Sequence, residues 1–311
     1  MRRTIQVGLS MLAVVVLFAG AIGTASAHPS GTTYLKVKAA HGGKPNRGNN
    51  LSYHGGAIES AVKVYIVWWG PQWSGSGFST GGYSSGQAQT YVGDFFANVG
   101  GSPWANSTTQ YCQGVASGTT QCGSAGIHPT NPAGELGGTW NDTSAVPTSP
   151  TQSQIAAEAS TLAAHFGGVN TTANYMVFTP TGHSESGFGT QWCAYHSSSG
   201  NVSYSYMPYQ PDAGASCGMN FVNPSNNAYG NGFFDGFSIV GGHEYGETIT
   251  DPYPNSGWLD GRGAENGDKC AWIASGQGAA SNIGLGGNSY AVQSLWSNAF
   301  NSGVGGCVLS Y

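Results

Sequence analysis

Charged side chains are scarce in this chain of 311 residues. Only 7 % of the sequence is Lys, Arg, Asp or Glu, whereas 12 % is aromatic. That composition excludes an intrinsically disordered chain, which needs high charge and few aromatics. Nine basic residues stand against fourteen acidic ones without forming a basic stripe, so nucleic-acid binding is not expected. The 51 glycines follow no Gly-X-Y period, which excludes a collagen-like structure.

Long hydrophobic runs are missing beyond the N-terminus. There, Arg2 and Arg3 precede an apolar stretch that includes residues 11–18, and Ala-Ser-Ala at 25–27 resembles a cleavage signal. The pattern predicts a signal peptide over residues 1–27 rather than a membrane anchor, because the apolar stretch is short. We therefore expect a secreted, extracellular protein without a membrane segment after cleavage.

Cysteines with CxxC spacing are also missing, which argues against a cysteine zinc site. The sequence has six cysteines, and an even number in an exported chain predicts disulfides, with 15 possible connectivities. The simplest of these pairs sequence neighbours: Cys112 with Cys122, Cys193 with Cys217, and Cys270 with Cys307.

Hydrophobic patterning predicts a single α+β domain over residues 57–311, preceded by a flexible N-terminal arm over 28–56. We expect a mixed β-sheet, an active-site helix and long Gly-rich loops tied by disulfides. The pattern predicts strands at 61–69, 174–179 and 202–207, the last of them half exposed, and helices at 87–99 and 153–166. Ser153 is the expected N-cap of the second helix.

Acidic residues gather in one short window. Half of them lie within 34 residues, between Asp235 and Asp268, around the sequence HEYGE at 243–247. Positions i and i+4 share one face of a helix, so His243 and Glu247 can bind the same metal ion. Glu244 is rotated away, but it can reach a metal-bound water.

This pattern is the HExxH metalloprotease motif with Glu in place of the second His. In that chemistry the metal lowers the pKa of water, and Glu244 would accept the proton as general base. The apolar residues before the motif favour a buried helix. The alternative is a capped helix with surface carboxylates and a hydrogen-bonded core histidine.

A third metal ligand is expected downstream of the motif. Glu265 lies 18 residues after Glu247, although it could instead form a salt bridge to Arg262 or Lys269. Two acids of the same Gly-rich loop are alternates, and they could also hold a structural calcium: Asp260 and Asp268. Zinc is the expected metal, with manganese or calcium as alternatives.

Other candidate residues carry weaker signals. His196 lies close to a cysteine, Cys193, and we interpret it as structural. Tyr245, Tyr253 and His196 are further candidates for stabilising charge on a substrate, without a pattern that selects one of them. Residues 214–218 match G-x-S-x-G by letter, but the predicted disulfide at Cys217 and the lack of a following helix make this a chance match.

Five separated segments resemble the phosphate-induced, EXORDIUM-like secreted proteins of plants and their bacterial relatives. They are VKVYIVWWG at 62–70, CAYH at 193–196, GHEYGETITDP at 242–252, GW at 257–258 and ENGDKC at 265–270. The resemblance implies a secreted or wall-associated protein.

These observations lead to two functional hypotheses. The first is a secreted metal-dependent hydrolase, a zinc metallopeptidase-like protein with His243, Glu247 and Glu265 as ligands and Glu244 as base. Its substrate would be a peptide or a cell-wall polymer, and we expect a monomer. The second is a non-catalytic extracellular protein that binds cell-wall polysaccharide. The nine Trp and sixteen Tyr favour it, since aromatic faces stack on sugars, although most of them are expected in the core.

Overall fold

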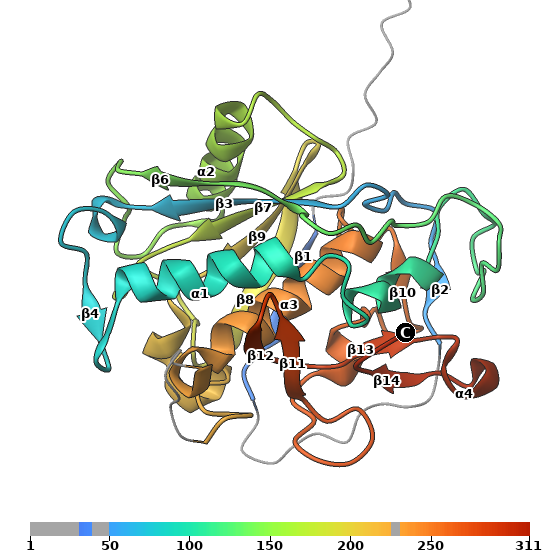
Figure 1. Ribbon diagram of the computed structural model, residues 1–311. Coiled ribbons are helices and arrows are strands. Elements are labelled where there is room, and N and C mark those ends of the chain that lie inside the picture. Colours follow the sequence, from blue (N-terminus) through green and yellow to red (C-terminus); the bar gives the residue numbers. More distant parts are fainter. Residues whose placement is uncertain (1–30, 39–49, 225–230) are drawn as a thin grey trace, which may run out of the picture.

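A six-stranded mixed β-sheet forms the centre of the structure, with helices on both of its faces (Figure 1). This computed structural model describes residues 31–38, 50–224 and 231–311. The predicted signal peptide over 1–27 lies outside these residues. The α+β class predicted from the sequence is confirmed.

Four α-helices and fourteen strands are described. The helices are α1 (Ser85–Asn98), α2 (Gln152–His165), α3 (Asn231–Thr250) and α4 (Phe300–Gly303). The strands are β1 (Thr32–Lys36), β2 (Ser52–Tyr53), β3 (Lys63–Trp69), β4 (Ser79–Thr80), β5 (Tyr83–Ser84), β6 (Leu136–Asp142), β7 (Ala173–Phe178), β8 (Trp192–Ser199), β9 (Val202–Met207), β10 (Trp258–Leu259), β11 (Ser281–Leu285), β12 (Asn288–Val292), β13 (Leu295–Ser297) and β14 (Gly306–Val308).

The main sheet has the strand order β1-β8-β9-β7-β3-β6. Strands β9, β7, β3 and β6 run parallel to one another, whereas β8 is antiparallel to both β9 and β1. Helix α2 packs on one face of the sheet, and α1 and α3 pack on the other (Figure 1). Each face of the sheet therefore faces a hydrophobic core of its own.

Three local predictions need correction. The predicted flexible arm contains two strands, because β1 pairs with β8 at the sheet edge and β2 pairs with β10. Strand β9 is fully buried rather than half exposed, since it lies inside the sheet with a helix layer on each side. The N-cap of α2 is Thr151, not Ser153: its side chain accepts a hydrogen bond from the Gln154 N–H in a capping box.

All six cysteines are paired, and the predicted connectivity is confirmed. The disulfides are Cys112–Cys122, Cys193–Cys217 and Cys270–Cys307. Three disulfides indicate folding in an oxidising compartment. Among the described residues, no helix has the length and hydropathy that a membrane span requires.

Helix α3 runs through the molecule and is buried along almost its whole length. Glycines let neighbouring segments approach its backbone closely. A Cβ at Gly236 would lie 2.4 Å from the Cys217 carbonyl oxygen, and one at Gly246 would lie 2.8 Å from a Leu295 methyl carbon. The helix that carries the predicted motif is therefore held tightly by its surroundings.

The burial of Glu158 on α2 predicts that the free energy of unfolding depends on pH. Burial, together with the nearby Asp142 carboxylate, raises the pKa of Glu158 to about 8. The folded state then binds this proton more tightly than the unfolded state, so stability falls as pH rises from about 4.5 to 8. In Glu158→Gln we expect a Tm about 5 °C above wild type at pH 9 and no difference at pH 5, measured by calorimetry. Equal Tm values at pH 9 would contradict the prediction.

Candidate metal centre

His243 and Glu247 lie on one face of α3, as their spacing predicts. His243 Nε2 is 3.0 Å from Glu247 Oε1, and both side chains are fully buried. The pair lacks hydrogen-bond geometry: His243 Nε2 has no hydrogen-bond partner in the described part of the chain. Two atoms that bind the same cation lie close together without a hydrogen bond between them. A donor and an acceptor at this distance would instead be aligned for a hydrogen bond.

The opposite nitrogen of His243 faces an acceptor. Gln293 Oε1 lies 3.3 Å from His243 Nδ1, and the Gln293 amide donates to the Gly267 carbonyl at 2.8 Å, which fixes its orientation. His243 therefore has an acceptor for an Nδ1–H, which leaves the Nε2 lone pair directed toward Glu247. Metal-binding histidines characteristically donate their other N–H to such an oxygen.

The downstream acids take different places from those predicted. Asp268, an alternate in the sequence analysis, is the acid that joins His243, with its Oδ1 3.8 Å from Nε2. Glu265 instead lies against His196, and Lys269 pairs with Asp260 at 3.0 Å. Glu265 therefore faces His196, and the same loop turns Asp268 toward His243. The role of Glu265 as a metal ligand stays a prediction. Asp260 also accepts backbone hydrogen bonds within its own loop and stands outside the cluster.

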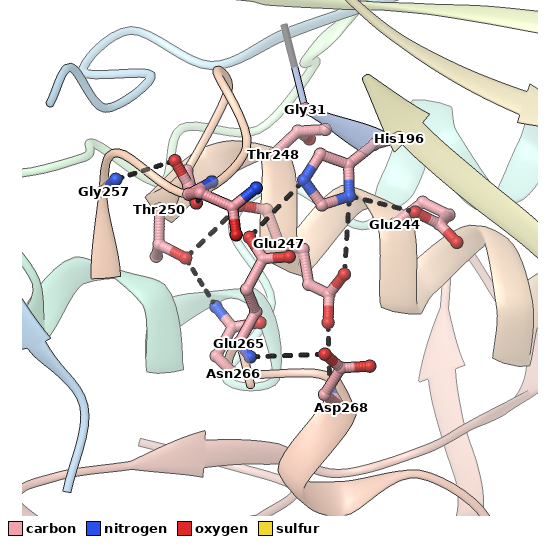
Figure 2. A network of polar contacts seen from close by, with 12 residues as sticks. Gly31, His196, Glu244, Glu247, Thr248, Thr250, Gly257, Glu265, Asn266 and Asp268 are labelled. Carbon is pink, nitrogen blue, oxygen red and sulfur yellow. Dashed lines mark hydrogen bonds and ion pairs between the residues drawn. The ribbon is translucent and has the colours of Figure 1, made fainter. Parts of the chain in front are cut away.

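His196 is the residue that the sequence analysis underestimated. Its Nδ1 lies 3.2 Å from Glu244 Oε2 and 3.4 Å from Glu247 Oε2, and its Nε2 lies 3.4 Å from Glu265 Oε1 (Figure 2). His196 is on β8, which packs against α3. Strand alternation from Ala194, whose side chain belongs to the core shared with α3, is the one signal that could have placed His196 there.

Tyr245 points away from this cluster. Its hydroxyl donates to Glu135 Oε2 at 2.5 Å. It is therefore not placed to stabilise a substrate, as one sequence-based candidate role suggested.

Two groups of side chains could each hold a metal ion, and they share one residue. The first group is His196, Glu244 and Glu247; the second is His243, Glu247 and Asp268. All members are fully buried except Asp268, whose side chain is 25 % exposed. Burying this many ionisable groups is costly unless a counter-charge accompanies them.

Several ligand-type atoms have no hydrogen-bond partner among the residues described. They are Glu244 Oε1, Glu247 Oε2, His196 Nε2, His243 Nε2 and both carboxylate oxygens of Glu265. Buried polar atoms are nearly always satisfied by protein, water or an ion. The donor set, carboxylates with imidazoles, is suited to a divalent cation such as zinc or manganese, so the residues present fit a metal.

The ionisable groups of the site shift one another's pKa values. Burial disfavours ionisation of Glu247, but the adjacent His243 and His196 outweigh it and hold the Glu247 pKa at about 2. Burial likewise opposes protonation of His243, but the Glu247 carboxylate raises its pKa to about 10. Burial raises the pKa of Glu265 well above its usual range and, with Glu247, that of Asp268 to about 7. Burial therefore favours the protonated forms of Glu265 and Asp268.

A cavity of about 480 Å³ adjoins Asp268. All five residues of β1 line it, together with Asp268 and Trp272. Since Asp268 both lines this cavity and belongs to the His243 group, the buried cluster meets solvent at that residue.

Comparison of the chain with protein-family models, with curated proteins and with solved structures finds no match. The resemblance to the EXORDIUM-like family therefore stays a prediction.

Proposed function

We propose that this chain is a secreted metal-dependent hydrolase of the metallopeptidase type, with a divalent cation, zinc first, held by His243, Glu247 and Asp268. The observation that carries the proposal is the convergence of His243 Nε2 and Glu247 Oε1 at 3.0 Å, with Asp268 beside them at the edge of a cavity. The third ligand in this proposal is Asp268 rather than Glu265.

The cation would supply a Lewis acid and lower the pKa of a coordinated water. The protein's own groups perform the remaining tasks. Gln293 orients His243, and the Asp268 backbone N–H donates to Glu247 Oε1 at 2.9 Å and orients that carboxylate. Asp268 brings the site to the cavity where a substrate can enter. The role of Glu244 as general base stays a prediction of the motif.

The cavity favours an extended peptide as substrate. It runs along β1, an edge strand of the main sheet as described. Extended peptides bind such edges through backbone hydrogen bonds. The resemblance to EXORDIUM-like proteins supports an extracellular or wall-associated location, and with it a cell-wall peptide or polymer as the alternative substrate.

The non-catalytic, polysaccharide-binding hypothesis gains little support. Eight of the nine tryptophans are buried, and the ninth, Trp140, is half-buried and stacks on His165. Side chains packed in the core cannot stack on a sugar.

The function can be tested on the purified protein by elemental analysis and by cleavage of a mixed peptide library. We expect bound divalent metal, cleavage that is lost on chelation and restored by zinc, and loss of both metal and cleavage in His243→Gln. The matched control is His165→Gln, which changes an exposed histidine on α2 and should leave both unchanged. A wild-type protein that binds no divalent metal after zinc addition would overturn the proposal.

A further inference from the structure

Glu247 lies between two histidines that approach its two oxygens separately. His243 Nε2 is 3.0 Å from Oε1, and His196 Nδ1 is 3.4 Å from Oε2. The two imidazoles come from different elements, α3 and β8. One carboxylate is thus presented to two potential ligand nitrogens at once.

The outer nitrogen of each imidazole also faces an oxygen. Gln293 Oε1 lies 3.3 Å from His243 Nδ1, and Glu265 Oε1 lies 3.4 Å from His196 Nε2. A hydrogen-bonded outer oxygen fixes the tautomer of a metal-binding histidine and directs its other nitrogen at the ion, and Gln293 does this for His243. Glu265 faces His196 Nε2 without hydrogen-bond geometry, and His196 Nδ1 lies between Glu244 Oε2 at 3.2 Å and Glu247 Oε2 at 3.4 Å.

The charge balance of the cluster also favours more than one cation. Four carboxylates surround the two imidazoles: Glu244, Glu247, Glu265 and Asp268. One divalent cation would neutralise two of them, and two divalent cations would neutralise all four. Glu244 Oε1, Glu247 Oε2 and both Glu265 oxygens lack hydrogen-bond partners in the described structure, so acceptor capacity remains for a second ion.

We propose that the centre binds two divalent cations bridged by Glu247, one with His243 and Asp268 and the other with His196 and Glu244. This rests on the proposed function for the first cation and adds the second. It makes Glu244 a ligand rather than a free general base, and it makes Glu265 a positioning residue for His196. Paired cations about 3.5–4 Å apart are typical of hydrolases that stabilise both the attacking and the leaving oxygen.

The test is the number of cations bound to the full chain. The metal-free protein is titrated with Zn²⁺ and analysed for metal after gel filtration, and a Mn²⁺-loaded sample is examined by electron paramagnetic resonance. We expect two Zn²⁺ per chain, and a spin-coupled Mn²⁺ signal because ions this close interact magnetically. His196→Gln should bind one Zn²⁺ and give an uncoupled Mn²⁺ signal, whereas the control His165→Gln should match wild type.

Glu244→Gln provides a second variant if His196→Gln does not fold. A ligand role predicts loss of one of the two cations, whereas a general-base role predicts loss of cleavage with metal content unchanged. One cation in wild type, retained in both variants, would overturn the second site and leave the proposed function intact. No cation in wild type would overturn both.

Discussion

Replacing Glu247 by Gln is expected to remove bound divalent metal and hydrolytic activity together. Glu247 belongs to both groups of side chains that could hold a metal ion, and each of its oxygens faces a different imidazole. A neutral amide offers one oxygen instead of two and places an NH₂ group against the other histidine. We expect the affinity for zinc to fall by at least about 100-fold, because even residues behind metal ligands contribute about 10–100-fold.

Glu158→Gln is the matched control for this variant. It makes the same chemical change at another buried glutamate, on the opposite face of the sheet, in α2. Zinc affinity, measured by competition with a chromogenic chelator, should be unchanged in this control. Retention of the full metal content in Glu247→Gln would contradict both the shared role of Glu247 and the proposed function.

Gly267→Ala should damage the same centre without altering a single ligand. The new Cβ would lie 2.7 Å from His243 Nδ1, closer than real Cβ contacts, and 3.0 Å from Glu247 Oε1, which is tighter than most of them. Backbone strain is not the reason, since Gly267 has φ −75° and ψ −46°, which alanine adopts readily. The imidazole or the loop must therefore shift, and we expect a loss of zinc affinity of about 10–100-fold.

Gly284→Ala serves as the control for the loop variant. A Cβ at Gly284, in β11, would meet nothing within 4 Å. The same chelator competition should give wild-type affinity for Gly284→Ala and weakened affinity for Gly267→Ala. Equal affinities in the two variants would show that Gly267 does not constrain the His243–Glu247 pair.

Short-range sequence patterns predicted the features that depend on residues close together in the sequence. The i, i+4 spacing placed His243 beside Glu247, and neighbouring cysteines formed the disulfides as expected. The α+β class followed from strands and helices with clear periodicity, such as β3 and α2.

Long-range packing decided what the sequence could not predict. His196 reaches Glu244 across 48 residues, and only the contact of β8 with α3 brings them together. Asp268, rather than Glu265, lies beside His243 because of the way in which one Gly-rich loop turns. The spacing of these acids in the sequence does not define that turn. Strand β1 has a polar, short sequence, and its structure comes from pairing with β8.

The wide separation of the candidate metal-site residues has a consequence for how the chain would acquire the proposed metal. His196 and Glu244 are 48 residues apart, and His243 and Gln293 are 50 apart, so the centre forms only after long loops have closed. An unfolded chain would hold a cation weakly. Metal uptake would then follow folding and stabilise only the folded protein. If the proposed metal centre exists, the availability of divalent ions in the compartment where the chain folds would set how much of the folded protein persists.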